Sequence, residues 1–467
     1  MGAQVAAVID TPPLDQVHWG IFVVDPKSGD TLISVNAQRK FVPASNQKIL
    51  VTAGALTLLG PQYRWDSAFY ATGPVLDGVL WGDLVLHGTG DPTLGPPFHP
   101  DANAALDHLV DSLQAAGVRS VQGSLVVDVS RFDSTSVPGS WMERNLPWAY
   151  SATGGGFVVG RGEVQVAFLP GAEVGDPVEV RWSPVGDPGF LESRLITLPA
   201  DGSDTLDPMY LPESRRILLQ GGWPAGEPDS LSLAMRDPVR QSTAALVRVM
   251  EERGIRLDRG ARIAWTPGEA ASGGCPAGSM PVCPGARRLA GLHSPPLEEV
   301  APVILKPSQN WMTDQTLMTL GMEFGSEGSR SAGFRVLESF VLGMVDADSL
   351  DFSFQDGSGL AADNLVTPRG IVEVLGFMDR SPHGSLFKES MAQPGQEPGT
   401  LRNRLEGLEG RVYAKTGTIS NVNSLSGYLI RPDGETLIFS ILSNGSGLPS
   451  SLVRGGIDEI VRILASR

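Results

Sequence analysis

Cysteine is scarce in this chain of 467 residues: the two that occur, Cys275 and Cys283, share one loop rich in glycine and proline. Their spacing is compatible with a local disulfide, which would suit an oxidising compartment, and equally with two free thiols. A structural zinc site is disfavoured, because such a site takes four protein ligands and the nearby His293 raises the local count only to three.

Basic residues are outnumbered: 36 Lys and Arg stand against 52 Asp and Glu, which gives a net charge of −16. This balance argues against a nucleic-acid partner, since phosphate binding needs a basic face, and against a general attraction to anionic membranes. No uninterrupted apolar run reaches the roughly 18 residues of a transmembrane helix. The first residues also lack the basic and apolar regions of a signal peptide, so we expect either a cytoplasmic protein or a trimmed mature form.

What is present describes a folded protein of two or three domains, with 41% hydrophobic and 19% charged residues. Strand-forming runs at both ends of the chain flank a helix-forming region, which predicts one α/β domain interrupted by a long insert. In that domain the N-terminal hairpin pairs with the C-terminal strands. The expected strands are residues 21–25, 31–35, 412–414, 425–430 and 436–442, and the expected helices are 310–320, 333–344 and 452–464.

The insert, residues 67–289, contains a repeated pattern. Its two predicted helices, 104–116 and 238–253, are each followed by glycine, an apolar residue, arginine and a strand, and Asp237 is expected to cap the second helix. We therefore predict two subdomains, residues 67–155 with 236–289, and residues 156–235, which is rich in β-structure. Residues 1–66 and 290–467 form the interrupted domain.

A serine and a lysine, Ser45 and Lys48, open an apolar run that is typical of a buried helix ending near Gly60. Positions i and i+3 share a helix face, so the lysine amine can reach the serine hydroxyl, as an activated nucleophile requires. Alone the pattern is weak, and Ser385 with Lys388 repeats it.

Two further motifs favour a catalytic role for Ser45 and Lys48 over a structural one. Ser308-Gln309-Asn310 precedes a predicted helix, and Lys415-Thr416-Gly417 sits beside a predicted strand. Each has a duplicate in the chain, at residues 34–36 and 27–29, but only the set that begins at Ser45 has the order helix start, loop before a helix, and strand.

With these three motifs the chain resembles the penicillin-binding serine acyltransferases, whose marks are Ser-x-x-Lys, Ser-x-Asn and Lys-Thr-Gly. More narrowly, it resembles the D-alanyl-D-alanine carboxypeptidases of the class C, peptidase S13 type, in which a large insert separates the first two motifs. Further similar segments are FVPASNQK, GTGDPTL, LKPSQN, DGSGLAADNLVTP and AKTGTISNVNSLSGY. The resemblance implies an α/β fold of the serine β-lactamase/transpeptidase type, an antiparallel sheet with helices on both faces.

The resemblance also implies a catalytic set. Ser45 would attack the carbonyl between two D-alanines and become an acyl-serine, with Lys48 as the base. Burial and the nearby ammonium of Lys415 are both expected to lower the pKa of Lys48. Ser308 would relay a proton to the leaving amine, and Asn310 would hold Lys48 and the substrate amide.

A second implied set binds the substrate. Lys415, Thr416 and Gly417 form the strand motif, in which the first two would receive the terminal carboxylate. The backbone N–H groups of Ser45 and Thr418 would form the oxyanion hole. No metal or other cofactor is implied. The implied partners are peptidoglycan peptides ending in D-Ala-D-Ala and β-lactam antibiotics as covalent inhibitors, and the implied location is the periplasm or cell envelope.

The sequence departs from the family pattern at two places. Gln309 occupies the middle of the second motif, where aspartate is usual, and residues 160–163 replace a stretch that normally carries asparagines. Two alternative functions are a serine β-lactamase, which is disfavoured because the water-activating Glu and Tyr motifs of that group are missing, and a scaffold that binds without turnover. The balance between carboxypeptidase and endopeptidase action, the oligomeric state and the role of the insert stay open.

Overall fold

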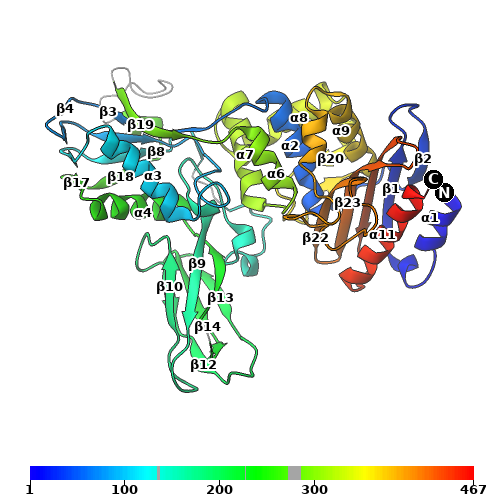
Figure 1. Ribbon diagram of the computed structural model, residues 1–467, viewed down its shortest axis with the longest axis horizontal. Coiled ribbons are helices and arrows are strands. Elements are labelled where there is room, and N and C mark those ends of the chain that lie inside the picture. Colours follow the sequence, from blue (N-terminus) through cyan, green and yellow to red (C-terminus); the bar gives the residue numbers. More distant parts are fainter. Residues whose placement is uncertain (134–136, 227, 272–285, 467) are drawn as a thin grey trace.

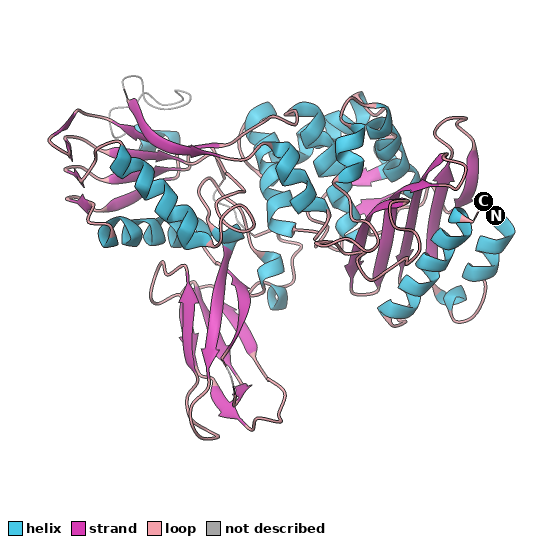
Figure 2. Ribbon diagram, viewed as in Figure 1, coloured by secondary structure: helices cyan, strands magenta, loops and turns pink. Residues whose placement is uncertain are grey.

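The computed structural model describes residues 1–133, 137–226, 228–271 and 286–466. Cys275 and Cys283, and with them the alternatives of a disulfide or two free thiols, lie outside the described residues. Figure 1 shows a β-sheet with its helices at the end of the molecule that holds both chain termini, and a mixed α/β region at the other end. A β-rich projection extends from the junction between them, as the strand colouring of Figure 2 makes clear.

The main sheet joins the two ends of the chain. Its strand order is β2-β1-β24-β23-β22, and every neighbouring pair is antiparallel. Ile21 of β1 lies opposite Ile441 of β24, so the predicted pairing of the N-terminal hairpin with the C-terminal strands is correct. The strands are β1 (His18–Val24), β2 (Thr31–Val35), β22 (Val412–Ile419), β23 (Val422–Ile430) and β24 (Thr436–Asn444).

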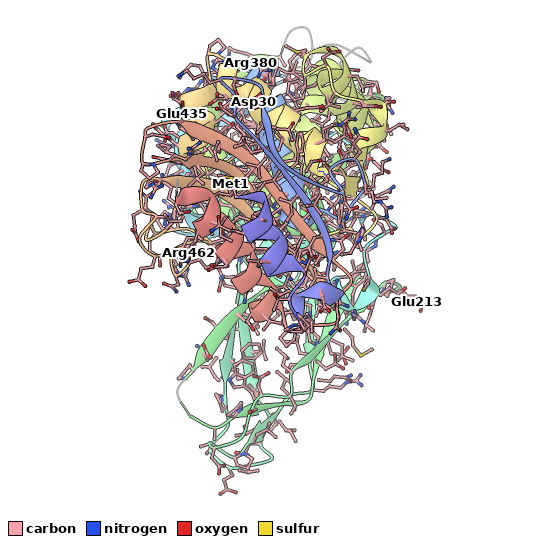
Figure 3. The ribbon with its side chains drawn as sticks, turned by 90° about the vertical axis from the view of Figure 1, so that its right-hand side faces the viewer. Met1, Asp30, Glu213, Arg380, Glu435 and Arg462 are labelled. Carbon is pink, nitrogen blue, oxygen red and sulfur yellow. The ribbon has the colours of Figure 1, made fainter. Side chains whose placement is uncertain are left out.

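Helices cover both faces of this sheet because its strands are apolar on both sides. Along β24, Phe439 and Ile441 face one core, and Ile438 and Leu442 face the other, as the two-residue period of a strand requires. On the first face lie α1 (Gly2–Ile9) and α11 (Ser450–Ala465), side by side in Figure 3. On the second lie α2 (Gln47–Leu58) and α9 (Pro368–Arg380). The predicted fold class is confirmed.

The remaining helices of this region pack around α2. Every residue of α2 from Gln47 to Leu56 is buried, in agreement with the all-round apolar sequence, and Gly60 follows the helix with a φ of 82°. The other elements are α6 (Leu297–Leu305), α7 (Asn310–Phe324), α8 (Arg330–Gly343), α10 (Gly384–Glu389), β20 (Phe352–Ser353) and β21 (Leu365–Val366).

The first part of the insert is built on the sequence repeat. Its two helices, α3 (Ala102–Ala115) and α4 (Pro238–Glu252), contact each other, and the strands that follow them pair in parallel. These pairs are β7 (Ser120–Val121) with β17 (Arg256–Leu257), and β8 (Leu125–Asp128) with β18 (Ala261–Ala264). The expected cap by Asp237 is wrong: this residue has a left-handed backbone, and its carboxylate pairs with Arg215 and Arg240 instead.

Around the repeat, two sheets complete this part of the insert, with strand orders β18-β8-β6-β3-β19 and β17-β7-β5-β4. The chain enters through β3 and returns through β19, which are antiparallel neighbours with Asp66 opposite His293. The added elements are β3 (Asp66–Ala71), β4 (Val75–Leu76), β5 (Val79–Leu80), β6 (Leu84–His87), β19 (Arg287–His293) and the short α5 (Pro267–Ala271).

The β-rich projection comprises small sheets with orders β10-β9-β16, β11-β14-β13 and β12-β15. Its core contains Phe168 stacked on Trp223. The division of the chain into an interrupted domain and a two-part insert stays a proposal, which these separate sheets support. The strands are β9 (Glu163–Leu169), β10 (Glu179–Ser183), β11 (Leu191–Ser193), β12 (Ile196–Leu198), β13 (Asp207–Leu211), β14 (Arg216–Gln220), β15 (Gly222–Pro224) and β16 (Asp229–Ala234).

One buried hydroxyl ties the sheet to a covering helix and gives a stability prediction. Tyr428 of β23 is fully buried, and its hydroxyl donates to the carbonyl of Leu375 in α9 at 2.8 Å. Tyr428→Phe should lower the free energy of unfolding by about 1 kcal/mol, because the ring stays and only the hydrogen bond is lost. Urea unfolding followed by circular dichroism measures the change, and an unaltered midpoint would contradict it.

Candidate functional site

Ser45 lies in a single 3₁₀ turn, Ala44–Asn46, immediately before α2. This turn is fixed to the main sheet by side-chain hydrogen bonds. The Asn46 amide donates to the backbone carbonyl of Lys415 at 2.9 Å and to the hydroxyl of Ser424 at 2.8 Å. Ser424 in turn donates to the carbonyl of Pro43 at 2.7 Å. The helix start that carries Ser45 is therefore held against strands β22 and β23, which belong to the other end of the chain.

The Lys48 amine lies at the centre of the site. Its Nζ is 2.8 Å from Ser45 Oγ and 2.7 Å from Asn310 Oδ1, and it also donates to the carbonyl of Ser358. Lys48 is fully buried. The spacing of three residues in the sequence thus produces the predicted serine–lysine contact.

Burial lowers the pKa of Lys48 to about 7, because an ammonium loses the hydration that stabilises it, while the carboxylates of Asp356 and Asp314 act against this shift. The expected effect of Lys415 on Lys48 is not supported. Instead, burial and then the charge of Lys48 lower the pKa of Lys415 well below its ordinary value. Near neutral pH a substantial fraction of Lys48 is therefore uncharged and able to take a proton.

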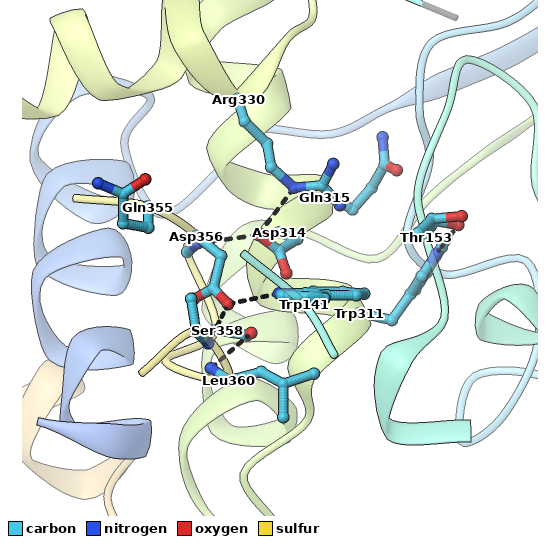
Figure 4. Close-up of polar contacts among 12 residues, drawn as sticks. Trp141, Thr153, Trp311, Asp314, Gln315, Arg330, Gln355, Asp356, Ser358 and Leu360 are labelled. Atoms are coloured by element: carbon cyan, nitrogen blue, oxygen red, sulfur yellow. Dashed lines mark hydrogen bonds and ion pairs between the residues drawn. The ribbon is translucent and has the colours of Figure 1, made fainter. Parts of the chain in front are cut away.

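Two buried aspartates, Asp314 and Asp356, shape the environment of Lys48, and neither was predicted to belong to the site (Figure 4). Asp356 accepts from the indole of Trp141 at 2.8 Å, from the amide of Asn364 at 2.9 Å, and from two backbone N–H groups of its own loop. Asp314 of α7 accepts from the backbone of Gly357 at 2.8 Å and lies 3.4 Å from Arg330. These bonds fix the loop whose Ser358 carbonyl contacts Lys48.

The second motif connects Lys48 with the insert. Ser308 has a positive φ of 68°, which turns the chain sharply into α7, and the side chain of Gln309 caps that helix by accepting from the N–H of Met312. While Asn310 Oδ1 accepts from Lys48, its amide nitrogen donates to the carbonyl of Tyr150 at 2.8 Å. One residue thus joins the amine to the insert.

The third motif lies within β22, and not beside a strand as predicted. Lys415 is fully buried and its Nζ donates to the carbonyl of Thr416. Gly417 is required by space: a Cβ there would lie 2.8 Å from the Pro43 carbonyl and 2.9 Å from the Ser45 nitrogen. The absence of a side chain allows β22 to approach the Ser45 turn, so that Thr418 follows on the edge of the site.

A cavity of about 550 Å³ opens at this point. The side chain of Ser45 meets it from one side and β22 from the other, and Thr416 bonds to Thr400 on its wall at 2.7 Å. A second cavity of about 630 Å³ shares Pro307, Ser308 and Pro398 with the first and extends toward the insert. The structure thus brings together Ser45, Lys48 and Asn310 by hydrogen bonds, and Ser308, Thr416, Gly417 and Thr418 around one cavity.

The two departures from the family pattern meet in space. Gln309 Nε2 is 3.4 Å from Glu163 Oε1, and Arg161 forms an ion pair with the same carboxylate at 3.1 Å. Burial raises the pKa of Glu163, which the arginine and the Gln309 amide oppose. An amide at position 309 therefore donates to a buried acid on the wall of the second cavity, where an aspartate would add a like charge.

The duplicate motifs lie elsewhere: Ser385 and Lys388 are in α10, and residues 27–29 form the β1–β2 turn. Among the described residues, no group of three or more His, Cys, Asp or Glu side chains could hold a metal ion, and no helix is long and apolar enough to cross a membrane.

The whole chain, residues 1–467, matches the model of the D-Ala-D-Ala carboxypeptidase 3 (S13) family. The chain belongs to this family. It is 31% identical over 460 residues to a D-alanyl-D-alanine carboxypeptidase of Actinomadura sp. (strain R39), covering 96% of this chain and 81% of that protein. The predicted family and enzyme class, a serine peptidase of the S13 type, are confirmed.

Solved structures show the same fold. Penicillin binding protein 4 from Haemophilus influenzae matches with a TM-score of 0.85 over 99% of both chains at 20% identity. Its complex with a novel β-lactam matches with a TM-score of 0.79 at 19% identity, covering 99% of this chain and 100% of that one.

The contact between Gln309 and Glu163 gives a prediction. Gln309→Glu should destabilise the protein by about 1–3 kcal/mol at neutral pH, because it replaces a donor with a second carboxylate beside a buried one. The loss should shrink at acidic pH, since protonating either carboxylate removes the repulsion. Unfolding midpoints measured from pH 5 to 8 test this.

The double variant Gln309→Glu/Glu163→Gln serves as the matched control, because it exchanges donor and acceptor and should recover most of the lost stability. Purely additive effects of the two substitutions would contradict the contact.

Proposed function

We propose that this protein is a serine D-Ala-D-Ala carboxypeptidase that acts on peptidoglycan stem peptides through an acyl-serine intermediate and is inhibited by β-lactams. The observation that carries the proposal is the contact of 2.8 Å between Lys48 Nζ and Ser45 Oγ, made by a buried amine with a pKa of about 7. A serine hydroxyl needs such a neighbouring base, because it is a weak nucleophile at its ordinary pKa.

In the proposed acylation, neutral Lys48 accepts the proton of Ser45 while Oγ attacks the carbonyl carbon between the two D-alanines. The backbone N–H groups of Ser45 and Thr418 stabilise the negative charge that forms on the carbonyl oxygen. Ser308, which lines the same cavity, passes a proton to the leaving amine, and the C–N bond breaks. D-alanine departs, and water then hydrolyses the acyl-serine ester.

Substrate orientation follows from the walls of the cavity. Asn310, already bound to Lys48, also offers an amide to the peptide on the acyl side. On the leaving side, the hydroxyls of Thr416 and Thr418 face the terminal carboxylate, with Lys415 buried behind them. The role of Lys415 is then chiefly to hold the strand and its neighbouring carbonyl, since its Nζ binds Thr416 O.

Cleavage of cross-linked peptides is a second candidate activity, favoured by the size of the joined cavities, about 550 and 630 Å³, which exceeds what a single D-alanine requires. A substrate of this kind places the protein outside the cytoplasm, in the periplasm or cell envelope. No cofactor enters the proposed reaction. A β-lactamase and a non-catalytic scaffold are distinguished by the experiments below.

Ser45→Ala should abolish both covalent labelling by benzylpenicillin and release of D-alanine from a peptide ending in Lys-D-Ala-D-Ala, because the acyl group has no oxygen to bind. Mass spectrometry over time after mixing with the drug measures the adduct. A lasting adduct of the drug's mass on the unmodified protein, absent from the variant, is the expected result. Ser385→Ala is the matched control, since Ser385 belongs to the duplicate motif in α10, and it should label normally.

Persistent labelling of Ser45→Ala would contradict the nucleophile assignment. Rapid disappearance of the adduct with nitrocefin turnover would favour a β-lactamase, and a stable adduct without any D-alanine release or cleavage of cross-linked muropeptide would favour the scaffold.

The rate of acylation should depend on pH through Lys48. Because the base must be neutral, the rate should rise about tenfold per pH unit below pH 7 and level off above it, following the pKa of about 7. Stopped-flow acylation by a chromogenic β-lactam between pH 5 and 9 measures the profile. Glu163→Gln should keep the same inflection, which separates Lys48 from the buried carboxylate of Glu163, whose pKa is raised; a flat profile would rule out Lys48 as the base.

A further inference from the structure

The leaving side of the first cavity is basic in a strongly acidic protein. Arg402, Arg404 and Arg454 line it together with Thr416 and Thr418, and no acidic side chain belongs to the described lining. The net charge of the chain is −16, so the three guanidinium groups beside the predicted carboxylate-binding residues have the sign opposite to that of the chain as a whole. A cavity lined by one sign of charge favours ligands of the other sign.

Two of the three arginines, Arg402 and Arg404, form ion pairs with carboxylates of the same chain. Arg404 donates two hydrogen bonds to Asp458 of α11, at 2.6 and 3.2 Å, and Arg402 lies 3.2 Å from Glu397. Within the part of the chain that the structure describes, no carboxylate forms an ion pair with Arg454. Asp458, one helical turn beyond Arg454, is the acid best placed to do so, but Arg404 occupies it.

The position of Arg454 is fixed by the first turn of α11. Ser450 donates to the side chain of Asn423, and Asn423 lies opposite Thr418 in the pairing of β22 with β23. Arg454 follows Ser450 by four residues and therefore shares its helix face, which is turned toward the end of β22. The half-buried guanidinium is thus presented to the cavity by an element anchored to the substrate-binding strand.

The lysine of the third motif is a poor source of fixed positive charge. Burial and the neighbouring Lys48 lower the pKa of Lys415 well below its usual value, and its Nζ is engaged by the carbonyl of Thr416. A guanidinium, in contrast, stays protonated at every physiological pH and binds a carboxylate through two N–H groups.

We propose that Arg454 is a specificity-determining residue that binds the carboxylate of the leaving residue, together with the hydroxyls of Thr416 and Thr418. This inference rests on the proposed function. Arg454 selects peptides that end in a free carboxylate over those in which that carboxylate is blocked, and it acts on binding more than on the chemical step.

The test compares two peptides that differ only at the C-terminus: one ending in D-Ala-D-Ala and one ending in D-Ala-D-Ala amide. Arg454→Gln should lower kcat/KM for the acid about tenfold, mainly through KM, as expected for the loss of one charge-assisted hydrogen-bonding group. It should leave the amide peptide nearly unaffected. Arg454→Lys should recover part of the loss for the acid, because it restores the charge without the paired donors.

Arg462→Gln is the matched control on the same helix. Arg462 is exposed, binds the carbonyl of Glu406 and does not line the cavity, so its substitution should change neither substrate. Benzylpenicillin and its methyl ester form a second acid and neutral pair, whose acylation rates report on Arg454 without requiring turnover.

Equal losses on the acid and neutral members of a pair would overturn the proposal in favour of a structural role for Arg454, and so would an unchanged rate on both acids. Failure of the proposed function is a separate outcome: the unmodified protein would then release no D-alanine and form no adduct with benzylpenicillin, and the assignment of Arg454 would be lost with it. If the unmodified protein acylates but does not release D-alanine, the penicillin pair still decides the role of Arg454.

Discussion

The structure depends on keeping one amine out of water. Lys48 is fully buried, and a buried ammonium is costly unless oxygen atoms replace its hydration shell. Ser45, Asn310 and the carbonyl of Ser358 supply those oxygens, and two buried aspartates add negative charge beyond them. As a result the Lys48 amine has a pKa of about 7, so that both its charged and its uncharged forms are present near neutral pH. The contacts that fix these oxygen atoms therefore also hold the Lys48 amine at hydrogen-bonding distance from Ser45.

The oxygens come from segments far apart in the sequence, so the site exists only when the whole chain has folded. The Ser45 turn belongs to the N-terminal end, Asn310 begins α7 after the insert, and Ser358 belongs to a later loop. The main sheet closes the arrangement, because Asn46 binds β22 and β23 from the C-terminal end. The three motifs are far apart in the sequence, and they meet in space because the two ends of the chain share one sheet.

Much of this could be predicted from the sequence, because the three motifs and their order identify the family and hence the relative positions of Ser45, Ser308 and Lys415. The buried helix and the strands at both ends could be predicted from their apolar runs, and the repeated helix–strand unit from the glycine, apolar residue and arginine that follow each helix. Asp356 begins the family-like segment DGSGLAADNLVTP, but neither its place near Lys48 nor that of Asp314 could be predicted, because the burial of an aspartate depends on tertiary contacts. The predicted cap by Asp237 is wrong for a related reason: the arginines that pair with its carboxylate come from the turn between β13 and β14 and from the first turn of α4.

The position of Arg454 could not be predicted from the sequence either. Nothing in the sequence of α11 indicates that Arg454 will face a cavity, or that Arg404 from another segment will form an ion pair with Asp458. Position 309 was a visible departure from the family pattern, but its partner Glu163 lies in the insert and became evident only in three dimensions. Interactions between sequence-distant polar groups are thus the part that a single sequence leaves undetermined.

The ribbon formed by β3 and β19 has a consequence for how the two regions could be separated. Because Asp66 and His293 are register partners, the insert could be cut out there and the ends joined by a short turn without breaking the main sheet. Such a minimal protein would nevertheless be chemically incomplete. Trp141, which donates to Asp356, and Tyr150, which accepts from Asn310, would leave with the insert. Residues of both regions therefore form the surroundings of Lys48, and a chain without the insert would lose these two hydrogen bonds.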